Sequence, residues 1–229
     1  MRARFLSSGS HDFADHELLE LLLFYSLPRK NTNELAHSLI ERFGSLRKVA
    51  AADVDELSSV TGIGKNTAAL IKLTLELAAR YERELFLPSK SLKSIDTAIS
   101  YARSLFLGAT SETVYLVLLD NEFMMLDCRP LSQGTVNEVK PIVREILERS
   151  VLKKASLALM LHNHPDGDHT PSDEDVEFTY LVNHELEALG VRLVDHIIVG
   201  QDNCSLIMNS PDGASRADQL FPSFYKKQS

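Results

Sequence analysis

Apolar residues recur at helical spacing through the first third of the chain. Between residues 16 and 86 they return every three or four positions, which predicts amphipathic or buried helices. Pro28 and Gly44 follow the first two of these stretches and are typical of helix ends. The expected helices cover residues 16–25, 31–43, 53–57 and 66–86. The first domain, residues 1–88, is therefore predicted to be all-helical.

The remaining chain alternates between short apolar runs and amphipathic stretches. The apolar runs predict strands at residues 113–119, 123–128, 156–161, 191–199 and 206–208. Helical spacing predicts helices at residues 95–107, at 139–152 and from about Asp175 to the stop at Gly190. Strands interleaved with helices predict an α/β domain, residues 94–209, whose sheet is covered on both faces. The polar segment 87–94 is the expected boundary of this two-domain α+β chain.

Composition argues against a membrane-spanning protein and against a secreted one. The 229 residues are 44% hydrophobic, which suits a packed globule, and no run of eighteen apolar residues could span a membrane. The first twelve residues lack the apolar centre of a signal peptide. Cys128 and Cys204 are isolated, which is typical of reduced thiols rather than of a secreted disulfide scaffold. We therefore expect a cytoplasmic protein with no membrane partner.

Charge is distributed unevenly between the two predicted domains. Residues 1–90 hold 12 basic and 12 acidic side chains of totals of 24 and 32, so the whole net charge of −8 falls on the remainder. An acidic region binds phosphate backbones poorly. Any contact with nucleic acid is therefore expected from the N-terminal half.

A glycine-containing turn joins the last two helices predicted in the first domain. Gly62, Gly64 and the adjacent Lys65 lead into the helix, where exposed amides at its positive end could bind a phosphate. This arrangement resembles a helix-hairpin-helix DNA-binding element. The alternative is a tight turn that needs its glycines only for positive backbone angles. Both interpretations stay open at this point.

Two histidines end the apolar run at residues 156–161. Side chains two apart on an extended chain face the same side, so His162 and His164 can converge on one ion. Asp175, in the first turn of the following helix, would complete a three-ligand zinc site with an open position. The alternative is that Ser172 and Asp175 form only a capping box at the start of that helix.

The same residues carry a resemblance to a known family. The sequence His162-x-His164-Pro165, six residues, Ser172, two residues and Asp175 resembles the signature of the JAMM metalloproteases. The surrounding His-Asn-His-Pro, with Gly167, is similar to the bacterial RadC branch, and the likeness covers nearly the whole chain apart from the tail after Asn209. Asp166 departs from the RadC pattern, which usually has serine there.

This resemblance implies a fold and an activity. We expect an all-helical helix-hairpin-helix module followed by an α/β/α JAMM domain, of the cytidine-deaminase-like kind, with a mixed sheet. The implied reaction is the zinc-dependent hydrolysis of a peptide or isopeptide bond in a peptide or protein substrate. A deaminase activity is not expected, because the His-x-Glu and Pro-Cys-x-x-Cys motifs are missing.

The resemblance also suggests which residues do the chemistry. Glu112, just ahead of the strand at 113–119, aligns with the JAMM glutamate that acts as the base, and Glu145 is its rival. Ser172 would stabilise an oxyanion, cap the helix, or do both. His196 is expected to be a hydrogen-bonded core residue. The alternative function is that of a non-catalytic, DNA-associated protein with a structural metal site, and the oligomeric state stays open.

Overall fold

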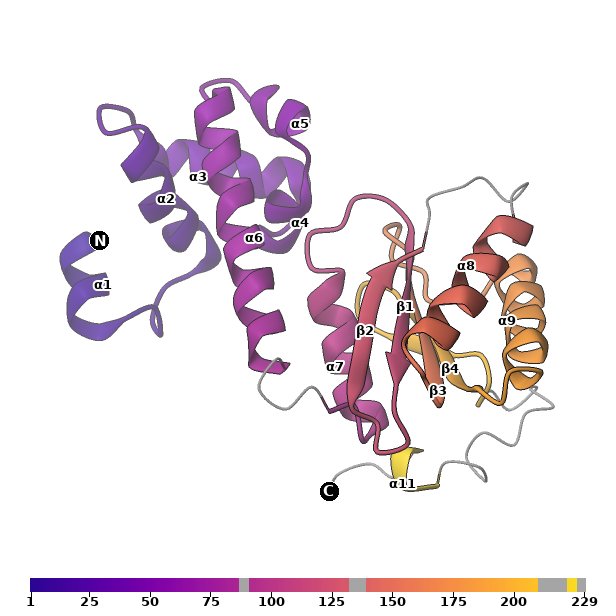
Figure 1. Ribbon diagram of the computed structural model, residues 1–229. Helices are drawn as coiled ribbons and strands as arrows, with labels where there is room; N and C mark the ends of the chain where they lie inside the picture. Colours follow the sequence, from indigo (N-terminus) through magenta and orange to yellow (C-terminus); the bar gives the residue numbers. More distant parts are fainter. Residues whose placement is uncertain (87–90, 132–138, 210–221, 226–229) are drawn as a thin grey trace. The chain divides into compact units, whose positions relative to one another are not determined.

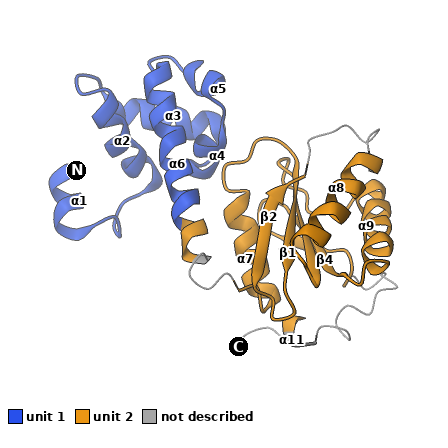
Figure 2. Ribbon diagram, viewed as in Figure 1, with its two compact units in different colours: residues 1–81 blue, residues 82–229 orange. Residues whose placement is uncertain are grey.

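The computed structural model describes residues 1–86, 91–131, 139–209 and 222–225. The chain divides into two compact units, Met1–Tyr81 and Glu82–Ser229 (Figure 2). Between Phe86 and Ser91 the predicted domain boundary falls partly outside the described residues, so its position at 87–94 stays a prediction. No helix in the described part of the chain has the length and apolar character needed to cross a membrane.

The described residues of the first unit are helices and turns, as the sequence predicted. The helices are α1 (Arg2–Ser8), α2 (Asp15–Ser26), α3 (Thr32–Phe43), α4 (Leu46–Ala51), α5 (Val54–Ser58) and α6 (Lys65–Phe86), which continues past the unit (Figure 1). Leu19, Leu23, Leu39 and Leu57 are almost fully buried between them. Helices α3, α4 and α5 each begin after a residue whose side chain caps them; Ser45, for example, accepts a hydrogen bond from the Lys48 amide.

A five-stranded mixed sheet forms the centre of the second unit. Its strands are β1 (Thr113–Leu119), β2 (Met125–Pro130), β3 (Leu157–Asn163), β4 (Arg192–Val199) and β5 (Cys204–Leu206), in the order β2-β1-β3-β4-β5. Only the pair β3 and β4 is parallel. Every residue of β3 is buried, because this strand is central and covered on both faces.

Helices cover both faces of the sheet. Helix α7 (Ile95–Leu105) packs on one face, together with the short C-terminal helix α11 (Pro222–Tyr225). Helices α8 (Val139–Leu152) and α9 (Asp173–Glu187) pack on the other face (Figure 1). This arrangement confirms the predicted combination of a helical N-terminal region and a helix-covered mixed sheet.

Two predicted strands are displaced by about two residues. Strand β2 begins at Met125 because the carboxylate of Asp120 accepts hydrogen bonds from the amides of Glu122 and Met124, which lengthens the turn. Phe123, expected to start the strand, has a φ of 60° and belongs to that turn. Strand β5 covers Cys204–Leu206 instead of residues 206–208. The turn before β5 is closed by a backbone hydrogen bond from the Gly200 amide to the Asn203 carbonyl.

Candidate metal centre

The carboxyl end of β3 brings two imidazoles together. His162 is the last but one residue of the strand, and His164 follows it, with its amide bonded to the Val199 carbonyl at the end of β4. The two rings meet edge to face, with centroids 4.8 Å apart. His162 is only 7% exposed, so its ring is fixed by the packing of the sheet. The strand places both rings on one side of the sheet edge, as its period of two predicted.

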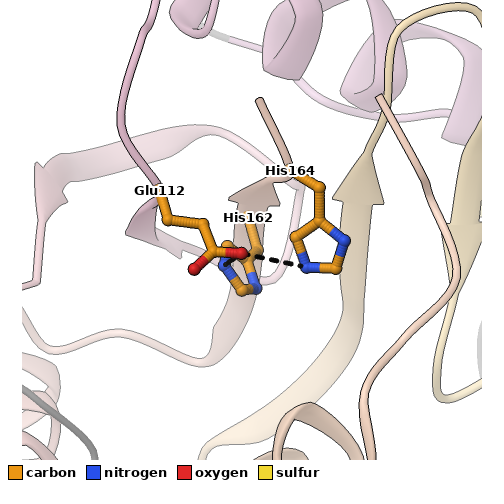
Figure 3. A group of neighbouring side chains, drawn as sticks. All are labelled: Glu112, His162 and His164. Atoms are coloured by element: carbon orange, nitrogen blue, oxygen red, sulfur yellow. Dashed lines mark ion pairs between the residues drawn. The ribbon is translucent and has the colours of Figure 1, made fainter. Parts of the chain in front are cut away.

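Glu112 reaches this pair from the neighbouring strand. Because β1 runs antiparallel to β3 and Val114 lies opposite His162, the residue before β1 lies beside His164. The Oε1 atom of Glu112 is 4.0 Å from Nε2 of His162 and 3.6 Å from Nε2 of His164 (Figure 3). One ligand atom from each of these three residues lies within 4.8 Å of the other two, so the group could hold a metal ion.

Asn163 holds the segment on which Glu112 sits. Its Oδ1 accepts a hydrogen bond of 2.8 Å from the Thr113 amide, and its Nδ2 donates one of 3.0 Å to the Ser111 carbonyl. The buried amide therefore bonds to the residue on each side of Glu112. A side chain of β3, between the two histidines, thus fixes the backbone of the carboxylate that faces them.

Asp175 approaches the same histidines from the first turn of α9. Its Oδ1 lies 3.0 Å from Nδ1 of His162, and its Oδ2 lies 3.5 Å from Nε2 of His164. Burial alone would raise the pKa of this carboxyl, but His162 and hydrogen bonds from Ser172 outweigh that effect and lower the pKa well below its ordinary value. Asp175 is therefore an anion, as a metal ligand must be.

The capping box is also present. Ser172 accepts a hydrogen bond from the Asp175 amide at 3.1 Å, while Oδ2 of Asp175 accepts one from the Ser172 amide at 2.9 Å. The Ser172 hydroxyl donates to the same Oδ2 at 2.7 Å. A hydroxyl has one hydrogen, so Ser172 would have to turn away from Asp175 to bind an oxyanion. That role stays a prediction.

The chemistry of these side chains suits a zinc ion. Two imidazoles and a carboxylate are a common donor set for zinc, with a second carboxylate beside them. Nδ1 of His162 is buried and, within the described part of the chain, makes no hydrogen bond of good geometry, although Oδ1 of Asp175 lies 3.0 Å away. A buried polar atom in that state is unfavourable unless a ligand contacts the group. The residues therefore fit a metal ion.

A third histidine, His196, is buried next to His162. His196 of β4 is fully buried, and its ring stacks on His162 with centroids 5.7 Å apart. The Thr179 hydroxyl lies 2.6 Å from the Asp175 carbonyl and 2.7 Å from Nδ1 of His196. Since its one hydrogen goes to the carbonyl, Nδ1 must donate. Burial lowers the pKa of His196 to about 3, which agrees with this neutral form. His196 is the hydrogen-bonded core residue that the sequence predicted.

The rival carboxylate lies elsewhere. Glu145 is on α8, with Oε1 3.6 Å from Nη1 of Arg149, and it is absent from the group that converges at the end of β3. Of the two carboxylates proposed as the base, the structure brings Glu112 to the histidines.

The glycine turn of the first unit has clear packing requirements. Gly62 has a φ of +96°, and a Cβ there would lie 2.8 Å from Cδ2 of Leu35. Around Gly64 a Cβ would meet nothing within 4 Å, and Lys65 begins α6. The Lys30 ammonium lies 3.4 Å from the Gly62 carbonyl, which adds a second cation beside the turn. The need for Gly62 is explained by the turn alone, and DNA binding stays a prediction.

Comparison with known proteins gives a family match within each of the two units. Residues 92–211 match a family model described as a RadC-like JAB domain, and residues 2–69 match one described as UPF0758 N-terminal. A UPF0758 protein of Rhodobacter capsulatus is 35% identical over 201 residues, which cover 88% of this chain and 94% of that protein. The chain belongs to the RadC-like UPF0758 family. A second UPF0758 protein, from Ruegeria pomeroyi, is 33% identical over 88% of this chain and 90% of its own length. The resemblance to RadC proteins is thereby confirmed.

The contacts of two residues beside the centre could not be read from the sequence. Asn163 lies inside the His-Asn-His-Pro motif, but its bonds on both sides of Glu112 depend on the pairing of β1 with β3. The contacts of Thr179 depend on how α9 packs against β4.

Proposed function

We propose that this RadC-like protein is a zinc-dependent hydrolase that cleaves a peptide or isopeptide bond. The observation that supports the proposal is the convergence of His162, His164, Asp175 and Glu112 from three separate segments of the chain. His162, His164 and Asp175 would hold the zinc ion, which when bound would polarise a carbonyl group and lower the pKa of a water molecule.

Glu112 is the proposed base. Its side chain is 63% exposed, so substrate and water can reach it from solvent, while its backbone is held by Asn163. The carboxylate would accept a proton from the attacking water and pass it to the leaving amine. Ser172, rotated away from Asp175, would donate its hydroxyl hydrogen to the developing oxyanion.

A matched pair of substitutions tests the assignment of the base. Glu112→Gln keeps the shape of the side chain but cannot accept the proton, so we expect normal zinc content and a rate about 10²- to 10⁴-fold lower. Glu145→Gln is the control and should change the rate little, because Glu145 pairs with Arg149 at a partly exposed site on α8. Activity would be measured on libraries of quenched peptides and of lysine-linked isopeptides.

The metal content of the purified variants separates a ligand from a base. His162→Ala and His164→Ala should each lose the zinc that the wild-type chain carries at about one ion per chain. Retention of zinc by both would refute the site. If Glu112→Gln also lost its zinc, Glu112 would be a ligand instead of the base.

We propose a second function, DNA binding by the first unit, on the separate observation that Lys30 and Lys65 lie beside the Gly62–Ile63–Gly64 turn. This is the alternative in which the protein is DNA-associated and its metal is structural. Affinity for duplex DNA should fall as salt rises, and Lys65→Glu should abolish it. Equal binding by the variant, or no binding at low salt, would leave the glycines with their turn role only.

The two cysteines support a proposal for the compartment. Cys128 and Cys204 are both free, and burial raises the pKa of the Cys128 thiol to about 11. We therefore propose the cytoplasm, where such thiols stay reduced.

A further inference from the structure

The orientation of His164 is set by a backbone carbonyl. Its Nδ1 lies 2.8 Å from the carbonyl oxygen of Asp168. A carbonyl can only accept a hydrogen bond, so Nδ1 carries the hydrogen and Nε2 keeps its lone pair. That lone pair lies 3.6 Å from Oε1 of Glu112 and 3.5 Å from Oδ2 of Asp175. Three electron-rich atoms thus face one another, which is the arrangement that a cation between them would stabilise.

The residues on both sides of Asp168 are attached to the β4–β5 turn and to β5 itself. The Gly167 carbonyl accepts a hydrogen bond of 3.1 Å from the Gln201 amide. The ring of His169 lies with Nδ1 2.9 Å from Oγ of Ser205. The carbonyl of Asp168 is therefore held between two fixed neighbours, although Asp168 itself is exposed.

Gly200 is the point at which the loop and the turn touch. A Cβ at Gly200 would lie 2.6 Å from the carbonyl oxygen of Gly167 and 2.9 Å from both the backbone nitrogen and the Cβ of His169. Contacts this short with backbone atoms cannot be relieved by rotating a side chain. The φ of Gly200 is outside the left-handed range, so glycine is required here for space and not for conformation.

We infer that Gly200 is a positioning residue for the metal centre: its missing side chain lets residues 167–169 lie on the β4–β5 turn, which places the Asp168 carbonyl against Nδ1 of His164. The loop thereby selects the tautomer that presents Nε2 to the other ligands. The inference rests on the proposed function for its consequence, which is metal affinity. Groups that orient a ligating histidine typically change metal affinity about 10- to 100-fold when they are removed.

Gly200→Ala tests the inference. The variant should bind zinc about 10- to 100-fold more weakly, measured by competition with a chromophoric chelator. The control is Gly190→Ala, because Gly190 has a φ of +74° but nothing within 4 Å of its Cβ position. That change strains the backbone without moving the loop, so it should lower thermal stability and leave zinc affinity unchanged. Equal affinities of folded Gly200→Ala and wild type would overturn the inference.

A second measurement needs no metal. The ¹⁵N shifts of the His164 ring in metal-free protein at about pH 8 report which nitrogen carries the hydrogen in the neutral form. The wild type should show the Nδ1–H form, and Gly200→Ala should show a mixture of both forms. If the wild type bound no zinc, the proposed function would fall, while this measurement would still decide the role of Gly200. An unchanged tautomer in the variant would refute that role.

Ser205→Ala covers the case in which Gly200→Ala does not fold. It removes the hydrogen bond to His169 without adding an atom, so it should loosen the same loop more gently. We expect weaker zinc binding and a mixture of His164 tautomers in this variant as well, with both changes smaller than in Gly200→Ala. If neither the tautomer nor the zinc affinity responded to Ser205→Ala, the loop would have no positioning role.

Discussion

The buried carboxyl of Asp195 makes a sharp prediction about stability and pH. Asp195 lies on β4 with no exposed surface, and its Oδ1 accepts hydrogen bonds from the amides of His196 and Met208 at 2.7 and 2.9 Å. The Tyr225 hydroxyl lies 2.7 Å from Oδ2 and 2.9 Å from the Val194 carbonyl. A phenol has one hydrogen to donate, so both contacts are satisfied when the carboxyl is protonated and donates to Tyr225.

The pKa shift of Asp195 gives the size of its effect on the free energy of unfolding. Burial raises the pKa of Asp195 from 3.8 to about 6, although hydrogen bonds from Tyr225, Met208 and His196 oppose the rise. A shift of this size corresponds to about 3 kcal/mol. The folded chain holds the proton more tightly than the unfolded chain does. This stabilisation is therefore fully present below pH 3.8 and is lost as the pH rises through about 6.

Asp195→Asn removes the charge and keeps the hydrogen bonds. The amide oxygen can accept from the same two backbone groups, and the amide nitrogen can donate to Tyr225 while its hydroxyl donates to Val194. The free energy of unfolding of the variant, measured in urea and compared with that of the wild type, should rise by about 2 to 3 kcal/mol between pH 4 and pH 7.5. Comparing the two chains at each pH cancels the opposite contribution of Asp175, whose pKa is lowered.

Two results would refute this reasoning. A difference between the two chains that does not vary with pH would mean that Asp195 titrates at its ordinary value in the folded chain. A variant several kcal/mol less stable than the wild type at pH 7.5 would mean that the ionised carboxylate is the form that the fold requires.

Two further substitutions test the packing around the centre. Thr179→Val removes the hydroxyl between the Asp175 carbonyl and His196 and so takes away the partner of the buried Nδ1 of His196. It should lower the free energy of unfolding by about 1 to 3 kcal/mol in urea titrations. A loss below about 0.5 kcal/mol would contradict the hydrogen-bond assignment. Phe224→Ala removes a fully buried ring that stacks on Phe123 with centroids 5.3 Å apart. It should lower the free energy of unfolding by about 3 to 5 kcal/mol. A loss below about 0.5 kcal/mol, as for a surface substitution, would show that α11 does not belong to this core.

Most of the fold could be predicted from residue patterns because burial dictates them. Strands β1, β3 and β4 lie on the predicted apolar runs, whereas β2 and β5 only overlap theirs. Strand β3 is buried along its whole length, as an uninterrupted apolar run requires. Helices α1, α4 and α11 were not predicted. Helix α1 has no buried residue and therefore no apolar periodicity, and the six-residue α4 and four-residue α11 are too short to show one.

The site could be predicted only where its residues are close in sequence. His162 and His164 follow from the period of a strand, but Glu112 lies fifty residues earlier and meets them only because β1 pairs with β3 in one register. Periodicity does not specify that register, so Glu112 was assigned through the resemblance. Gly200 and Thr179 act through contacts between elements that no local pattern encodes.

Asp175 shows why two interpretations of one motif need not compete. The sequence offered a helix cap or a metal ligand, and a carboxylate has two oxygens. Oδ2 accepts both hydrogen bonds from Ser172, and Oδ1 faces His162 at 3.0 Å. The cap fixes the rotamer, and the positive end of α9 together with the hydrogen bonds favours the anion. The capping box therefore holds Oδ2 beside His164 and leaves Oδ1 facing His162, which is the arrangement that the proposed ligation needs.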